Sequence, residues 1–333
     1  DCDKYRSMSR QTLEALQSGG PIALPDAVLE QPSVSVRPDS RLASLSGVFF
    51  LGGLLIYVAT RVVGITKFPI YFFTDEAIQT LLAADLLRDG FRSPDGVFLP
   101  TYFKNVYQYN LSVSVYLQIV PYLLFGKSVW VTRLTPMLVT TLAAASVALI
   151  LRDGFRQSHW WVGTMLLSIM PAWFLHSRTA FEVTLMVSFY AAGLYFYMRY
   201  RSLSPRNIYP ALVFFSLAFY SYSTGHMVVA TSGILLLLFD AKYHWRQRRT
   251  LIWASGLLIL LALPYVRFRW QHPTAFREHL AWIGSYWAEP LPLVEKLRLF
   301  TTRYLYGLSP AYWMIPNQHD LIRHVMRGYP HLH

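Results

Sequence analysis

The sequence predicts an all-α integral membrane protein with about seven transmembrane helices. Of its 333 residues, 54% are hydrophobic and only 14% are charged, whereas a soluble domain carries about 25% charged residues. Segments 45–65, 129–151 and 251–266 each approach the roughly 20 apolar residues that cross about 30 Å of hydrocarbon. Backbone polar groups in that layer must bond within their own segment, so these spans are expected to be helices.

Four further apolar segments, separated by polar or helix-breaking residues, bring the number of expected spans to seven. They cover residues 160–176, 183–198, 209–224 and 227–239. An eighth segment, 109–125, is short and is interrupted by Gln118 and Pro121. It therefore leaves two options open, a further span or a helix that lies in the membrane interface.

Basic residues occupy alternate connections between the spans, and this pattern orients the helices. They are Arg152 and Arg156 in the first such connection, Arg199, Arg201 and Arg206 in the second, and Lys242, Arg246, Arg248 and Arg249 in the third. Cytoplasmic loops carry an excess of Lys and Arg, so we expect these three connections in the cytoplasm. The long loops 66–128 and 267–333 then lie outside if segment 109–125 does not span. If it does span, loop 66–128 is cytoplasmic.

Three regions follow from this topology. Residues 1–44, with four prolines and mixed charge, are expected to form a disordered cytoplasmic tail. Residues 45–266 form the seven-helix module, which includes the outer loop 66–128. Residues 267–333 form a second large outer loop whose Trp and Tyr residues suit a water–lipid boundary, and we expect further helices beyond it.

Composition also excludes several classes of protein. The formal net charge of +12 is spread in short runs between apolar segments, so it does not make the single basic face of a nucleic-acid-binding protein. Cys2 is the only cysteine, which excludes a disulfide framework and a thiol metal site.

The most informative local motif is the acidic pair Asp75–Glu76 in the first outer loop. It opens a segment whose apolar residues Ile78, Leu81 and Leu82 recur at helical spacing, which predicts an amphipathic helix along the membrane. Two interpretations remain open. In the first, the acids only favour a helix N-terminus. In the second, one carboxylate is a general base at the bilayer surface.

Glu182 is expected on the same outer face as Asp75, so two acids there would make a site. Arg178 precedes it by four residues, and an intrahelical ion pair between them is the alternative. His226 lies in the shortest outer connection, either as a polar cap or as a functional group. The segment 317–324 contains Asp320, Arg323 and His324. Asp320 and His324, with His319, are conceivable metal ligands, but they lack the spacing of a tetrahedral site.

The order of these features resembles the C-type membrane glycosyltransferases. The features are Asp75–Glu76 in a long first outer loop, Leu124-Phe125-Gly126 before a span that contains Arg133, and Pro171 followed by Ser177-Arg178 through Glu182. Segment 317–324 is similar to the pattern Asn-Gly-Asp-Pro-Asn-x-Arg-His of bacterial relatives, although its Gly and Pro are absent here. Within the superfamily, the chain most resembles the protein O-mannosyltransferase and aminoarabinose transferase branch.

The resemblance implies an inverting enzyme that moves a monosaccharide, hexosyl or pentosyl, from a polyprenyl-phosphate donor to a hydroxyl of a protein or lipid. The expected location is the plasma (inner) membrane, with the site on the extracytoplasmic face. Asp75 is the expected base, with Glu76 and Glu182 as the other catalytic candidates. The donor phosphate is expected to bind Arg178, His226, Arg323 and His324. No cofactor follows with certainty from the resemblance, and a divalent cation stays an open option.

A non-catalytic subunit of a membrane complex is the rival interpretation, because the individual motifs are loose. A transporter is less favoured. Its broken helices would form a matched pair in two repeats, whereas Pro121, Pro171 and Pro264 lie near the ends of their segments.

Overall fold

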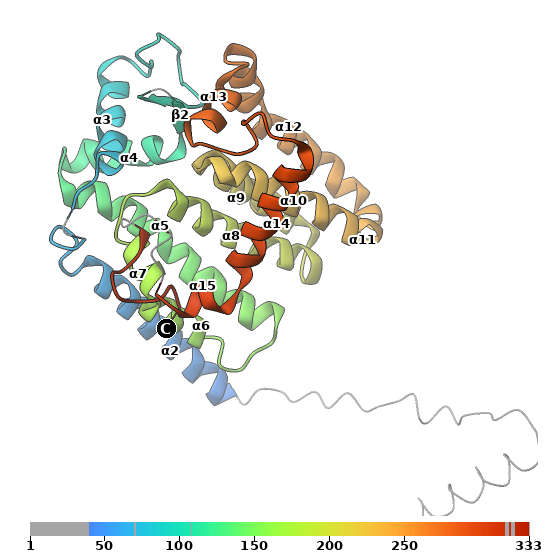
Figure 1. The fold of residues 1–333 in the computed structure, drawn as a ribbon. Coiled ribbons are helices and arrows are strands. Elements are labelled where there is room, and N and C mark those ends of the chain that lie inside the picture. Colours follow the sequence, from blue (N-terminus) through green and yellow to red (C-terminus); the bar gives the residue numbers. More distant parts are fainter. Residues whose placement is uncertain (1–39, 70, 107, 317–319, 321–323, 333) are drawn as a thin grey trace, which may run out of the picture. The chain divides into compact units, whose positions relative to one another are not determined.

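A computed structural model describes residues 40–69, 71–106, 108–316, 320 and 324–332. Of the expected tail, residues 1–44, the first 39 lie outside the described residues. The first described helix, α2 (Ser40–Val62), includes the last five residues of that range. Arg323 and His319 also lie outside the described residues. Helices dominate the described chain (Figure 1), as the sequence predicts.

The three segments that best fit a membrane span in the sequence are helices in the structure. They are α2, α5 (Val129–Leu149) with its π-helical extension Ile150–Gly154, and α12 (Arg248–Gln271). All three are long and apolar enough to cross a bilayer. The exposed fractions of Leu55 (71%), Leu138 (55%) and Ile252 (69%) are those of side chains that face lipid rather than a protein core. The prediction of a multi-pass membrane protein is confirmed at this level.

The other expected spans are not among the helices that are both long and apolar enough to cross a bilayer, so the count of seven stays a prediction. They are α8 (Glu182–Ser202), α9 (Ile208–Ser221) and α10 (Ser223–Phe239). Segment 160–176 is not one helix but two, α6 (Val162–Ile169) and α7 (Pro171–His176). Met170 between them is extended (φ −64°, ψ 118°), because a residue that precedes proline is disfavoured in the helical region.

The first outer loop contains two helices and a hairpin. Helix α3 (Thr74–Arg88) and helix α4 (Val113–Phe125) flank strands β1 (Phe103–Asn105) and β2 (Gln108–Leu111), which pair antiparallel. The hairpin corrects the all-α prediction for this loop. A core joins these elements, and it contains Leu82, Ala83, Leu86, Phe103, Leu111 and Val115. Helix α3 therefore packs within protein and does not only lie along the membrane.

The basic connections meet at one end of the helices. Tyr200 of α8, Ile208 of α9 and Ala254 of α12 share a core with residues of α10 and of α11 (Ala241–Arg246). At the opposite end, Tyr102 of the first outer loop packs with Phe268 of α12 and with Ala275 of α13 (Ala275–Trp282). The two ends differ as the charge pattern requires, and the side of the membrane that each one faces stays a prediction.

This topology is testable with single cysteines in a Cys2→Ser background. A membrane-impermeant maleimide is expected to label Ser93→Cys in intact cells, because the predicted topology places residues 66–128 outside. It should label Ser202→Cys, at the basic end of α8, only after the cells are opened. The reverse labelling order would overturn the orientation.

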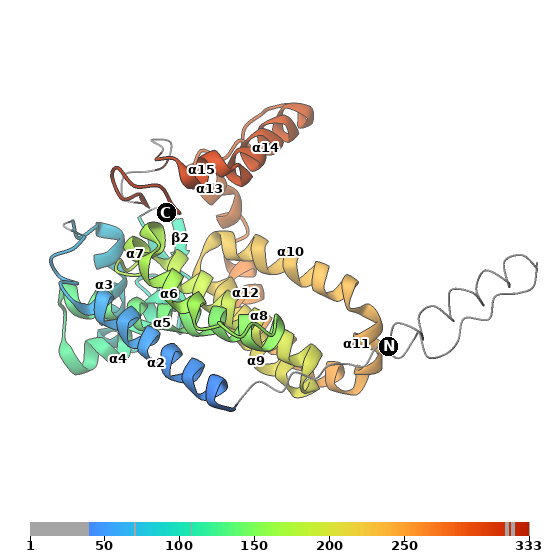
Figure 2. The same cartoon turned by 90° about the horizontal axis from the view of Figure 1, so that it is seen from below.

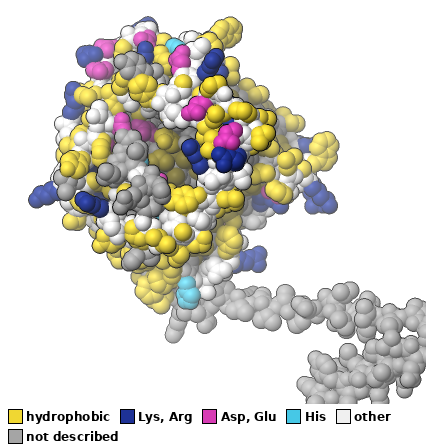
Figure 3. All heavy atoms as spheres, in the orientation of Figure 1, with side chains coloured by type: hydrophobic (Ala, Val, Ile, Leu, Met, Phe, Trp, Pro, Cys, Tyr) yellow, Lys and Arg dark blue, Asp and Glu magenta, His cyan; other side chains and the backbone are white. Residues whose placement is uncertain are grey.

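The last described elements are α14 (Leu293–Leu308) and α15 (Pro310–Met314), which stand apart from α10 and α12 in Figure 2. No residue of α14 is buried. Its Leu293 (64% exposed), Val294 (78%) and Leu305 (60%) present apolar surface. An amphipathic helix of this kind suits the water–lipid boundary that the sequence predicts for this region. Hydrophobic side chains also spread over the face drawn in Figure 3.

Candidate active site at the N-termini of α3 and α8

The site begins at the first turn of α3. Phe73 is the N-cap in an extended conformation, and Thr74 is the first helical residue. Glu76 reaches back, and its Oε1 accepts a hydrogen bond from the backbone N–H of Phe73 (3.2 Å). This bond satisfies one of the N–H groups that a helix start leaves without a partner. The expectation that these acids stabilise a helix N-terminus therefore fits Glu76.

Glu76 and Arg133 form a buried ion pair between α3 and α5. The guanidinium Nε and Nη2 donate to Oε2 and Oε1 of Glu76, each at 2.9 Å, and both side chains are 0% exposed. Arg133 also donates to the backbone carbonyls of Ile65 and Pro69 (both 2.9 Å) and Tyr71 (2.7 Å). Two-point contact between guanidinium and carboxylate is among the strongest side-chain interactions in proteins.

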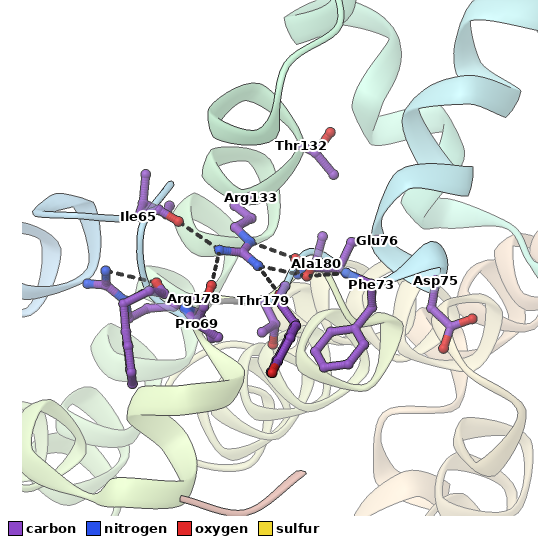
Figure 4. A network of polar contacts seen from close by, with 12 residues as sticks. Ile65, Pro69, Phe73, Asp75, Glu76, Thr132, Arg133, Arg178, Thr179 and Ala180 are labelled. Carbon is purple, nitrogen blue, oxygen red and sulfur yellow. Dashed lines mark hydrogen bonds and ion pairs between the residues drawn. The ribbon is translucent and has the colours of Figure 1, made fainter. Parts of the chain in front are cut away.

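The same carboxylate also holds the segment that leads into α8. The backbone N–H of Ala180 donates to Glu76 Oε2 at 3.0 Å. Glu76 thus joins α3, α5 and the start of α8 (Figure 4). An acid with Arg133 on both oxygens and no exposure has no route to a substrate proton, so we correct the expectation that Glu76 is a catalytic candidate. It positions the site instead.

Asp75 points elsewhere. Its carboxylate lies on the side of α3 away from Arg133 in Figure 4, and the residue is partly exposed. Adjacent helical residues project about 100° apart, so the two acids face different ways, and here Glu76 is the buried one. Of the two acids, Asp75 is the one whose position suits a reaction with a substrate.

Gln79 connects Asp75 to Glu182. Its Nε2 donates to the backbone carbonyl of Asp75 (3.0 Å), to Oε1 of Glu182 (3.1 Å) and to the carbonyl of Ala180. Gln79 is 2% exposed and Glu182, the first residue of α8, is 8% exposed. Gln79 therefore ties the Glu182 carboxylate to the backbone at the start of α3, and the Asp75 contact is through its carbonyl and not its carboxylate. The sequence analysis missed Gln79, although it lies one turn after Asp75.

Arg178 does not have the role expected of it. Its guanidinium donates to the backbone carbonyls of Thr60, Val63 and Phe68, with Phe68 receiving bonds of 3.2 and 3.0 Å. The side chain is only 2% exposed, so its donors are already used and it is a poor ligand for a donor phosphate. It also lies in the turn before α8, which excludes the intrahelical ion pair with Glu182.

His324 brings the C-terminal segment to this site. Its ring stacks on His176 of α7 (centroids 5.3 Å apart, planes at 9°) and contacts Phe181, which directly precedes Glu182. The Nδ1 of His324 lies 3.2 Å from Nε2 of His176. Asp320 binds His331 at 2.9 Å. Among the residues that the structure describes, no group of three or more His, Cys, Asp or Glu is arranged to hold a metal ion.

His226 lies in a different place. Its Nε2 is 2.8 Å from the Tyr102 hydroxyl, and Tyr102 lines a cavity of about 230 Å³ between the first outer loop and the end of α12. Lys104, Tyr109 and His272 also line this cavity. Burial and the nearby carboxylate of Asp95 raise the pKa of Tyr109, which donates to Asp95 Oδ2 at 3.3 Å. The sequence analysis missed these three lining residues, which are scattered among loop and helix positions without a motif.

Two comparisons bear on this arrangement. The family model of dolichyl-phosphate-mannose-protein mannosyltransferases matches residues 113–268. The fold is similar to crystal structures of ArnT from Cupriavidus metallidurans, in the apo state (TM-score 0.52, 12% identity, 71% of this chain covered) and bound to undecaprenyl phosphate (TM-score 0.50, 12% identity, 73% covered). This chain spans 44% of the length of each ArnT chain. A search of curated proteins gave no match.

At this level of identity, the likeness to ArnT concerns the fold alone. Together with the family model, it confirms the resemblance to C-type membrane glycosyltransferases that the sequence predicts.

Proposed function

We propose that this chain is an inverting membrane glycosyltransferase that uses a polyprenyl-phosphate sugar on the extracytoplasmic side of the plasma (inner) membrane. The observation that supports this most is the outward carboxylate of Asp75, which projects from a helix end fixed by the buried Glu76–Arg133 pair. The ArnT structure bound to undecaprenyl phosphate supports a lipid-linked donor. The acceptor in this proposal is a hydroxyl of a protein or a lipid, and the sugar is a hexose or a pentose.

In the proposed reaction, Asp75 takes the proton of the acceptor hydroxyl. The acceptor oxygen then bonds to the anomeric carbon as the bond from that carbon to the phosphate oxygen breaks. The polyprenyl phosphate leaves with the electron pair of the broken bond and needs no proton, so one base suffices. A single in-line displacement inverts the anomeric configuration.

The leaving phosphate requires cationic or hydrogen-bonding groups in the same region. His324 is proposed as one ligand, because it packs against Phe181 beside Glu182. Arg323, which lies outside the described residues, is proposed as a second ligand from the sequence alone. His226 is proposed to act from behind the cavity wall through its contact with Tyr102, and Lys104 adds a cation to the cavity. Glu182 is proposed to orient the acceptor or a sugar hydroxyl, since Gln79 holds its carboxylate in place.

The test is a transfer assay with the purified full chain in lipid nanodiscs. Polyprenyl-phosphate mannose and polyprenyl-phosphate aminoarabinose are supplied in turn with membrane extract as acceptor. We expect one of them to release polyprenyl phosphate faster than nanodiscs without protein. Donor binding without release from either sugar would favour the non-catalytic subunit instead.

A further inference from the structure

The basic end of the helices contains a second pocket, which shares no lining residue with the cavity at Tyr102. It measures about 270 Å³ and is lined by Arg201 of α8, Phe239 and Asp240 at the end of α10, and Lys242, Tyr243 and Arg246 of α11. Three of its six lining residues are cationic and one is acidic. The charge of the pocket therefore suits an anion.

Neighbouring side chains fix Arg201 and Asp240 of this pocket in place. Arg201 Nε donates to Asp240 Oδ1 at 2.9 Å, and its guanidinium lies 4.3 Å from the centre of the Tyr243 ring. Asp240 is itself held by the Tyr197 hydroxyl, which donates to Oδ2 at 2.6 Å, and the Tyr243 hydroxyl donates to the carbonyl of Tyr200 at 2.7 Å. Arg201 is thus pre-ordered, and little rotamer entropy remains to be lost when a ligand binds.

Helix α11 supplies the excess of positive charge in the pocket. Lys242 and Arg246 are four residues apart on α11 and so share one side of it. Within the part of the chain that the structure describes, neither of them has an ion pair or a hydrogen bond through its side chain. Asp240 offsets the charge of Arg201, and the charges of Lys242 and Arg246 remain for a ligand.

Exposed apolar side chains of α10 adjoin this pocket, and Phe239 belongs to both. Ile234 (58% exposed), Leu238 (68%) and Phe239 (84%) are exposed, and Trp245 beside the pocket is 73% exposed. Figure 3 shows Lys and Arg side chains at the edge of the molecule where Figure 1 places α11. An occupant should therefore have an anionic end for the pocket and an apolar part for α10.

We propose that this pocket binds the phosphate headgroup of an anionic phospholipid, whose acyl chains lie along the exposed side of α10. Arg201 provides planar donors from α8, and Lys242 and Arg246 provide two further positive charges from α11. Anionic lipids are abundant in the leaflet that basic loops face, so the predicted topology agrees with this ligand. The proposal does not depend on the transfer reaction.

The test uses the purified full chain in zwitterionic detergent. It is titrated with radiolabelled phosphatidylglycerol or phosphatidylcholine, and bound lipid is counted after gel filtration. We expect saturable binding of phosphatidylglycerol and none of phosphatidylcholine. The Lys242→Gln/Arg246→Gln variant should lose roughly 30-fold in affinity, because each basic side chain near an anionic lipid surface contributes about 1 kcal/mol.

The matched control is Arg248→Gln/Arg249→Gln. It removes the same charge from the same basic connection, outside the pocket, and should retain the affinity of the original chain. Equal losses in both variants would mean general charge attraction and would overturn the site. Equal binding of the two lipids would overturn it as well. Full displacement of phosphatidylglycerol by an equal concentration of inorganic phosphate would show that the ligand is a free phosphate group and not a lipid.

Discussion

Asp75→Asn should reduce turnover by about 10²- to 10⁴-fold, which is the usual contribution of a general base. The substitution keeps the shape of the side chain and removes its basicity. Asp75 lies outside the Glu76–Arg133 pair, so thermal stability in detergent should stay close to that of the original chain. Turnover is measured as release of polyprenyl phosphate at saturating donor.

Glu182→Gln is the matched comparison for this experiment. Because Gln79 holds Glu182 at 3.1 Å, a glutamine there can keep that contact as an acceptor. A smaller loss of turnover than in Asp75→Asn is expected. Wild-type turnover in a folded Asp75→Asn protein, together with an inactive Glu182→Gln, would transfer the role of base to Glu182.

Arg133→Met should be the most destabilising single change near the site. It leaves the Glu76 carboxylate buried without its partner, and breaking one side of a buried ion pair typically costs about 3–5 kcal/mol. It also removes the donors from the carbonyls of Ile65, Pro69 and Tyr71. The measurement is the thermal unfolding temperature in detergent, compared with Glu76→Leu and with the double variant Glu76→Leu/Arg133→Met.

The double variant should lose less than the sum of the two single variants, because no charge is then left buried alone. Arg88→Gln is the control on the same helix. Arg88 pairs with Asp85 at the surface, with 67% of its side chain exposed, so its loss should shift the unfolding temperature little. Additive losses in the Glu76–Arg133 cycle would show that the two residues do not act as a pair.

The sequence predicts three of the seven expected spans well, because lipid imposes a strong and local rule on composition. Helices α2, α5 and α12 follow directly from it. The break at Pro171 was visible in the sequence as a proline, but the apolar run continues through it, so hydropathy alone joined two helices into one. The hairpin of β1 and β2 was missed because strands of three and four residues are too short for an alternating pattern to stand out.

The candidate site was predicted only in part, for a different reason. The sequence indicates that Asp75 and Glu76 open a helix, and the angle between neighbouring helical residues means that they face different ways. Which one turns inward depends on Arg133, 57 positions further along the chain. Arg178 shows the same limit, since its partners Thr60, Val63 and Phe68 lie more than 100 positions earlier. Motifs indicate residue types, whereas these partners come from tertiary packing.

The Glu76–Arg133 pair has a consequence for how the chain is assembled in the membrane. Arg133 lies in the second turn of α5, a helix long and apolar enough to span, and an unpaired arginine within a span is costly. Glu76 is synthesised first, so α3 is already present when α5 enters the bilayer. Insertion of α5 and docking of α3 are therefore expected to be coupled, with Glu76 as the counter-ion that lowers the cost of burying Arg133.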